Sequence, residues 1–101
     1  MIETVVTHEF KNWVRSLRDQ TIRARIGARI RRLEAGNFGD ARPVGKGVSE
    51  LRIHAGPGYR VYFQRRGELL VLLLLGGDKS TQSQDIELAI KLAETFKDKS
   101  K

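Results

Sequence analysis

The pattern of apolar and polar residues in the middle of the chain predicts a β-hairpin. Residues 50–53 and 59–63 alternate in character, which is the period of a strand with one buried face. For the apolar sides of the strands to meet, Ile53 must lie opposite Val61, and the connection is then residues 56–58, a bulged turn with a positive φ at Gly58. The polar residues of the two strands would share one solvent-facing surface: Arg52, His54, Arg60 and Tyr62.

Helical spacing of apolar residues predicts three helices, two before the hairpin and one near the end of the chain. Thr7 is placed to cap the first helix and Asp19 the second. The last helix would begin at Ser80 or Thr81, with Gln84 in capping-box spacing from Thr81. The three apolar stripes are Phe10, Trp13, Val14 and Leu17; Ile22, Ile26, Ile30 and Leu33; and Ile86, Ala89, Ile90, Ala93 and Phe96.

Two further strands complete the predicted sheet, residues 2–6 and the leucine-rich residues 69–75. The second run is apolar on both sides, so we expect an interior strand that is at least partly covered on both faces. A tight turn before it would set Phe63 opposite Leu70.

The segments between these elements are predicted to be irregular. Residues 37–47 collect Gly, Pro, Asn and Asp and should form a loop, and residues 76–79 should end the leucine strand. The charged tail, residues 97–101, is expected to fray. The predicted order is β-α-α-β-β-β-α, an α+β fold of two layers with the two N-terminal helices packed on a small, mostly antiparallel sheet. Residues 1–101 would form a single domain.

The charge balance favours a polyanionic partner. The 101 residues include 19 Lys and Arg against 12 Asp and Glu, a net charge of +7, so nucleic acid is the first candidate. The absence of cysteine excludes disulfides, thiolate metal sites and cysteine nucleophiles. With no signal-peptide pattern and no apolar run long enough to cross a bilayer, we expect a cytoplasmic protein without membrane contacts.

Arginines crowd the polar positions of the second predicted helix. They form either a solvated helical face or a nucleic-acid contact, and both descriptions can hold for different members of the group. We take Arg25, Arg29 and Arg32 as the candidates for RNA contact, together with Lys46, which lies between two glycines in the predicted loop.

A second cationic group is predicted where the hairpin meets the end of the leucine strand. Arg52, Arg60 and Lys79 would form a concave cluster with only Glu50 and Asp78 as nearby acids. An arginine fork binds phosphate through two donors, so the cluster favours a phosphate ligand, although a surface salt-bridge pattern is the alternative. No spacing of metal ligands occurs in the sequence, and we expect neither metal nor cofactor.

The chain resembles the RelE/ParE superfamily of toxins from bacterial type II toxin–antitoxin modules. The resemblance lies in the hairpin ELRIHAGPGYRVYF, the following LLVLLLLGGDKSTQSQDI, the early F-x-x-W-x-x-x-L helix and the R-P-V-G-x-G-V-x-E-L-R segment, and it covers nearly the whole chain. The most similar subgroup is that of addiction module killer proteins, often grouped with HigB-like toxins. The resemblance implies a two-helix layer on a small sheet whose first strand lies beside the last.

The resemblance also implies a function. Ribosome-dependent members cleave mRNA in the decoding site without a metal, and a small helix-turn-helix antitoxin neutralises them. Arg60 matches the catalytic or phosphate-binding arginine, and Arg52 and Lys79 match other basic site residues less closely. Many members carry Tyr or His near the C-terminus, whereas the tail ETFKDKSK has neither. Tyr62 and His54 are then the local candidates for proton transfer, and Tyr62 would need a strongly lowered pKa.

Two other functions also fit the sequence. The missing C-terminal Tyr or His favours a ParE-like inhibitor that blocks DNA gyrase by binding, without cleaving RNA. The blandest alternative is a basic nucleic-acid-binding module with no activity of its own.

Overall fold

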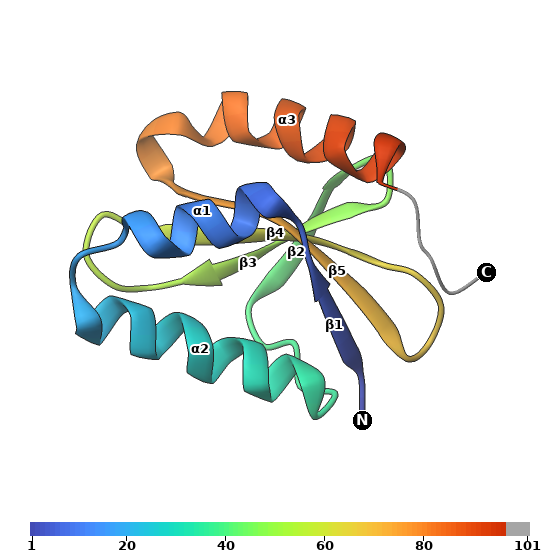
Figure 1. The fold of residues 1–101 in the computed structure, drawn as a ribbon, viewed down its shortest axis with the longest axis horizontal. Coiled ribbons are helices and arrows are strands. Elements are labelled where there is room, and N and C mark those ends of the chain that lie inside the picture. The colour runs from blue at the N-terminus through green and yellow to red at the C-terminus, as the bar shows by residue number, and fades with distance from the viewer. Residues whose placement is uncertain (97–101) are drawn as a thin grey trace.

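The computed structural model describes residues 1–96, and the tail that was expected to fray lies outside them. Five strands form one sheet in the order β1-β5-β4-β3-β2, with β1 parallel to β5 and the other neighbours antiparallel (Figure 1). The elements are β1 (Glu3–Val6), α1 (His8–Ser16), α2 (Gln20–Glu34), β2 (Ala41–Gly45), β3 (Val48–Ile53), β4 (Tyr59–Arg65), β5 (Leu70–Asp78), a short 3₁₀ turn (Lys79–Thr81) and α3 (Gln82–Thr95).

The first two helices begin where their capping residues predict. The hydroxyl of Thr7 accepts a hydrogen bond from the amide of Phe10, and the carboxylate of Asp19 accepts one from the amide of Thr21. The apolar stripes of both helices pack on one face of the sheet, with Phe10 and Leu33 among the buried residues of that core. The α+β class, the two-helix layer and the placement of β1 beside β5 are therefore confirmed.

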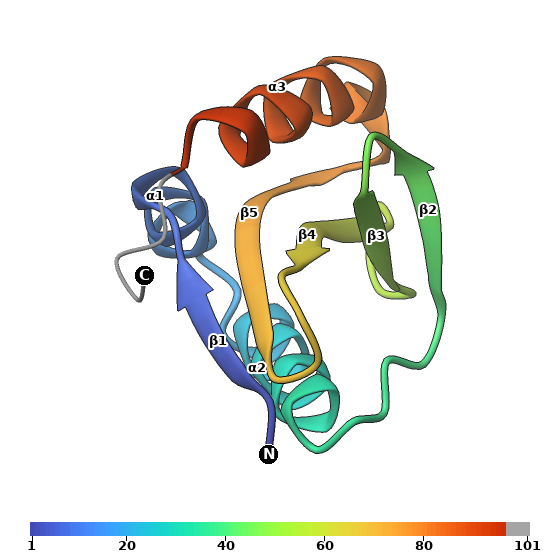
Figure 2. The same cartoon turned by 90° about the vertical axis from the view of Figure 1, so that its right-hand side faces the viewer.

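Helix α3 covers the other face of the sheet, as Figure 2 shows from the side. Ala89 and Ala93 of its predicted stripe are buried there against the second side of β5. Residues 71–77 are all buried, so the leucine strand is the interior strand that its two-sided apolar pattern predicted. Within residues 1–96, no helix is both long and apolar enough to cross a membrane.

The β3–β4 hairpin differs from the prediction in register. Leu51 pairs with Val61 and Ile53 with Tyr59, so the connection is residues 54–58 and not 56–58. The shift from the predicted pairing is two residues, an even number, so each side chain keeps its predicted face. The turn has positive φ at Gly56 as well as at the predicted Gly58.

The β4–β5 pairing also differs from the prediction. Phe63 pairs with Leu73 and not with Leu70, and an irregularity between Tyr62 and Phe63 shifts the register along the strands. The three-residue shift at Phe63 comes from a turn longer than predicted, since Arg65 already pairs with Val71 before the bulge is reached. Because three is an odd number, Val71 and Leu73 lie on the face of Phe63 that was predicted for Leu70.

A strand, β2, occupies part of the predicted loop at residues 37–47. Pro43 lacks a backbone N–H donor. It is tolerated because β2 lies at the edge of the sheet and has only one neighbouring strand, β3. Lys46 and Gly47, with φ of 55° and 79°, form a two-residue turn that returns the chain into β3. The glycines that indicated a loop therefore mark a tight hairpin.

The end of β5 is the fourth difference from the prediction. The strand continues through Gly76 and Gly77, which were expected to end it. A side chain at Gly76 would collide with the ring of Trp13 from α1, and one at Gly77 would collide with the carboxylate of Asp85 from α3. The two glycines thus let helices approach the same strand from opposite faces.

Helix α3 does not use the predicted capping box. Asp78 caps the preceding 3₁₀ turn by accepting hydrogen bonds from the amide and hydroxyl of Ser80. The hydroxyl of Thr81 donates to Asp85 and leaves the first amides of the helix uncapped by a side chain.

Candidate functional site

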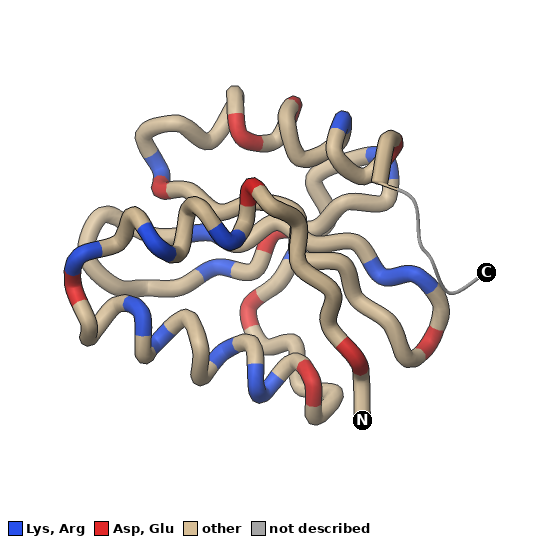
Figure 3. Tube along the Cα trace, viewed as in Figure 1, with Lys and Arg blue, Asp and Glu red and all other residues tan. Residues whose placement is uncertain are grey.

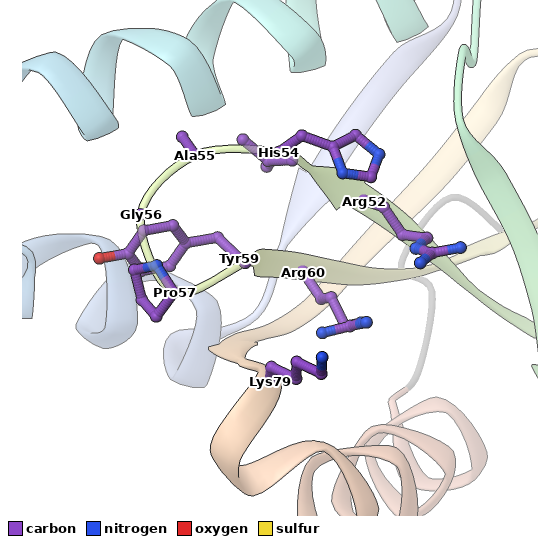
Figure 4. A pocket seen from close by; sticks show the side chains of 10 residues that line it. Arg52, His54, Ala55, Gly56, Pro57, Tyr59, Arg60 and Lys79 are labelled. Carbon is purple, nitrogen blue, oxygen red and sulfur yellow. The ribbon is translucent and has the colours of Figure 1, made fainter.

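An open pocket of about 450 Å³ lies where the β3–β4 connection meets the end of β5. Arg52 from β3, Arg60 from β4 and Lys79 from the 3₁₀ turn line it, with His54 at its rim (Figure 4). The pairing of Arg52 with Arg60 places the two guanidiniums on neighbouring strands and on one face. Arg52, Arg60 and Lys79 therefore lie together, as the sequence predicted. Figure 4 shows Arg60 and Lys79 pointing toward each other.

A buried carboxylate lies behind the arginines. Glu50 is only 2% exposed, and its Oε1 lies 3.2 Å from Nε of Arg60. Its Oε2 lies 3.9 Å from Nε of Arg52 and 4.0 Å from Nε of Arg42 on β2. Gln82 of α3 donates a hydrogen bond to Oε1. Glu50 therefore offsets part of the positive charge, and three arginines around one carboxylate leave the cluster cationic.

Arg42 joins this group because residues 41–45 form a strand. The cross-strand pairing of Arg42 with Glu50 sets their side chains on the same face. Sequence reasoning missed it because the Gly- and Pro-rich composition of the segment indicated a loop, in which no residue has a defined face.

His54 is held by a carboxylate that the sequence did not point to. Its Nε2 lies 2.5 Å from Oδ2 of Asp40, and its side chain is 70% exposed. The hydrogen bond from His54 lowers the pKa of the Asp40 carboxyl, and the positive charge of Arg52 lowers it further. The imidazole is thus oriented by Asp40 at an open rim of the pocket, a position from which it can exchange protons with solvent or ligand.

Tyr62 does not lie on the solvent-facing surface where the alternation placed it. The face is correct, but α3 covers it there, and Tyr62 is fully buried in the core beneath that helix. Burial, and then the charges of Glu50 and Asp85, raise the pKa of Tyr62 to about 12. A base working near neutral pH would need the opposite shift, so this environment keeps the phenol protonated.

The predicted RNA-contact residues are spread over other surfaces. Arg25 and Arg32 lie exposed on α2, the helix whose cations Figure 3 shows on the side of the sheet away from α3. Lys46 lies in the β2–β3 turn, at the end of β3 opposite the pocket.

Arg29 of the same helix has a structural role that the sequence pattern did not reveal. Its guanidinium is partly buried and donates hydrogen bonds to the carbonyl oxygens of Arg52 and Phe38. Burial, and then the charge of Arg32, lower the pKa of Arg29. It was predicted to face solvent and RNA, whereas it ties α2 to the strand that carries Arg52.

Residues able to hold a metal are not gathered at this pocket. In the part of the chain that the structure describes, no three His, Cys, Asp or Glu side chains come together as a metal site requires.

Comparison with known proteins places the chain in a family. Residues 12–97 match the family described as phage-derived protein Gp49-like. The chain belongs to this family. A Haemophilus influenzae protein described as uncharacterized is 48% identical to it over 93 residues, which make up 92% of this chain and 94% of the relative. No solved structure matches the chain significantly.

Gp49-like proteins are toxin-like proteins associated with addiction modules. The match spans the β3–β4 hairpin, the pocket and all of α3, so it includes the whole candidate site. Family membership suggests an antitoxin as the partner of this chain.

Proposed function

We propose that this Gp49-like protein is the toxin of a type II toxin–antitoxin module, of the RelE/ParE superfamily and its HigB-like subgroup. In this proposal it cleaves mRNA on the ribosome, in the cytoplasm and without a metal, and a helix-turn-helix antitoxin neutralises it. The observation that supports it most is the open pocket in which Arg52, Arg60 and Lys79 converge beside an oriented histidine.

The charges of this pocket suit phosphoryl chemistry. Arg52 and Arg60 contact Glu50 through Nε, so the terminal nitrogens of both guanidiniums remain available to a phosphate. A phosphorane-like transition state carries more negative charge than the phosphodiester, so fixed cations stabilise it more strongly than they stabilise the substrate. Lys79 adds a mobile point charge from the far side of the pocket.

The proposed reaction uses the 2′-hydroxyl of the target nucleotide as the nucleophile. Its oxygen bonds to the adjacent phosphorus as the bond to the 5′-oxygen of the next nucleotide breaks, and this leaves a cyclic phosphate. His54 takes the proton of the 2′-hydroxyl, and the departing 5′-oxygen gains a proton from solvent. Asp40 keeps the imidazole in place through its contact with Nε2.

The exposed cations outside the pocket would hold the ribosome and the mRNA. Arg25 and Arg32 on α2 and Lys46 at the β2–β3 turn supply attraction to phosphates that does not depend on sequence. Arg29 contributes indirectly, by fixing the backbone at Arg52.

Cell-free translation followed by primer extension tests the proposal. Wild-type protein should produce defined cuts in the message, and Arg60→Ala should reduce cutting by about 1,000-fold and relieve growth arrest while antitoxin binding is kept. Arg23→Ala, at an exposed position of α2, is the matched arginine control and should still cleave. Intact mRNA beside arrested growth would contradict the nuclease proposal.

A gyrase inhibitor is the second candidate. The observation that favours it is the burial of Tyr62, because among the two predicted proton-transfer residues only His54 reaches the pocket. A supercoiling assay with purified protein separates the two functions, since an inhibitor would stop gyrase and leave mRNA uncut. A protein that does neither and does not arrest growth without its antitoxin would be a nucleic-acid-binding module only.

A further inference from the structure

We propose that Glu50 is a positioning residue of the site, which holds the guanidiniums of Arg60 and Arg52 by their Nε edges so that their terminal nitrogens face the pocket. The inference rests on the proposed function for the reaction it serves. Its structural basis is independent of that function, because it lies in the contacts of Glu50 itself.

Glu50 is a buried carboxylate. A carboxylate that is 2% exposed has lost nearly all of its hydration, which is costly unless charges and hydrogen bonds replace the water. Arg60 and Gln82 serve Oε1, and Arg52 and Arg42 serve Oε2. Since the partners come from β2, β3, β4 and α3, the carboxylate is fixed from several elements at once.

The contacts of Glu50 with the two arginines are made through Nε of each guanidinium. The interaction with Arg60 is an ion pair at 3.2 Å, in which Nε makes no hydrogen bond within residues 1–96, and the Arg52 contact is longer still. Neither arginine forms the two-pronged pair that would commit its terminal nitrogens to Glu50. The carboxylate therefore orients both guanidiniums and leaves free the donors that a phosphate needs.

Glu50 does not line the pocket. Arg52 and Arg60 line the pocket, whereas Glu50 lies behind them and is not part of its wall. A base or acid must reach the reacting atoms, and Glu50 is separated from them by the groups it holds. It acts through the arginines, by lowering the cost of arranging them before substrate arrives.

Glu50→Gln tests this role, because glutamine keeps the size and an acceptor for Gln82 but removes the charge. We expect mRNA cleavage to fall about 10- to 100-fold, mainly in kcat, since the substrate still binds while the arginines lose their fixed direction. Glu68→Gln is the matched control on the exposed β4–β5 turn and should cleave within about 2-fold of wild type. A folded Glu50→Gln protein that cleaves like the control would overturn the proposal.

A double-mutant cycle separates positioning from a general structural role. In an Arg60→Ala background, Glu50→Gln should cost less than about 3-fold more, because the main group it positions is gone. The double variant should also melt at a higher temperature than Arg60→Ala, since it no longer buries a carboxylate without its nearest cation. If Glu50→Gln loses the same factor in both backgrounds, it does not act through Arg60, and the proposal is wrong.

Arginine side-chain relaxation in the wild-type protein gives a test that needs no variant to fold. The Nε–H vectors of Arg60 and Arg52 should be restrained before any RNA is added, in contrast to that of Arg23 on α2. Equal mobility of all three would overturn the inference. If the wild type cleaves no mRNA, the proposed function fails, and restrained Arg52 and Arg60 would still show that the pair is held in place before RNA binds.

Discussion

Arginines occupy two settings in this fold, and they differ in what holds them. Arg52 and Arg60 converge on a buried carboxylate across neighbouring strands, on the face that α3 partly covers. Arg25 and Arg32 lie along α2 on the opposite face, exposed to solvent. The first pair has its direction fixed and can act on one phosphate, whereas the second attracts polyanions generally. Under the proposed function, the same residue type therefore supplies chemistry in one place and affinity in the other.

Replacing the fixed arginine without removing its charge should have the largest effect. Arg60→Lys keeps a cation for Glu50 but removes the planar fork, so we expect cleavage of mRNA to fall about 100-fold. The melting temperature should change little, because the buried carboxylate keeps a partner. Single-turnover cleavage and thermal unfolding measure the two quantities. Cleavage within a few-fold of wild type would place the catalytic charge elsewhere in the pocket.

Arg29 tests whether the exposed helix and the pocket are mechanically linked. Arg29→Met removes the hydrogen bonds to the carbonyl oxygens of Arg52 and Phe38, and should lower the free energy of unfolding by about 1–3 kcal/mol. Arg25→Met, on the exposed side of the same helix, should change it by less than about 0.5 kcal/mol. Urea unfolding of both variants makes the comparison, and equal losses would remove the structural role of Arg29.

The exposed arginines should affect affinity and leave the rate unchanged. For Arg25→Gln combined with Arg32→Gln, we expect KM for the ribosome to rise about 3- to 10-fold with kcat unchanged. The slope of log affinity against log salt should decrease by about two, one for each lost charge. Cleavage titrations at several salt concentrations provide both numbers. A fall in kcat alone would assign these residues to the reaction.

Tyr62→Phe should have the smallest effect near neutral pH. In residues 1–96 the buried hydroxyl has no hydrogen-bond partner, so its removal should leave cleavage within about 2-fold of wild type. The difference should appear in alkali. Because folding raises the pKa of Tyr62 from its usual value near 10 to about 12, the neutral phenol contributes stability that is complete below pH 10 and lost as pH rises through 12.

Unfolding curves across that range should therefore show wild type losing up to roughly 3 kcal/mol relative to Tyr62→Phe. Parallel curves for the two proteins would contradict the assigned pKa. Loss of cleavage in Tyr62→Phe near neutral pH would return the phenol to the list of catalytic groups.

The sequence was sufficient where local chemistry decides the structure. The hydroxyl of Thr7, the carboxylate of Asp19 and the apolar stripes placed three helices, and alternation assigned Arg52 and Arg60 to one face. The sequence did not reveal features that depend on contacts between distant segments. Nothing local distinguishes pairing of Ile53 with Tyr59 from pairing with Val61, because both registers bury the same side chains.

The features of the candidate site that the sequence did not reveal also depend on contacts between distant segments. Tyr62 shares its face with Arg60, but its burial depends on where α3 crosses the sheet, which alternation within a strand does not specify. The network around Glu50 depends on an edge strand whose Gly and Pro content is typical of a loop. Asp40 approaches His54 only because β2 pairs with β3. Each of these contacts joins segments that have no sequence signal in common.

The adjacent glycines of β5 have a consequence for genetics. Gly76 and Gly77 leave no room for a side chain, because Trp13 occupies one face of the strand and Asp85 the other. If the protein arrests growth, survivors selected after its overexpression should carry substitutions at these two positions as well as at Arg60. Both kinds of survivor would show the same growth phenotype. They would separate in a pull-down with the antitoxin, because substitutions at the two glycines disrupt the packing of helices on β5, whereas the Arg60 variants keep the fold.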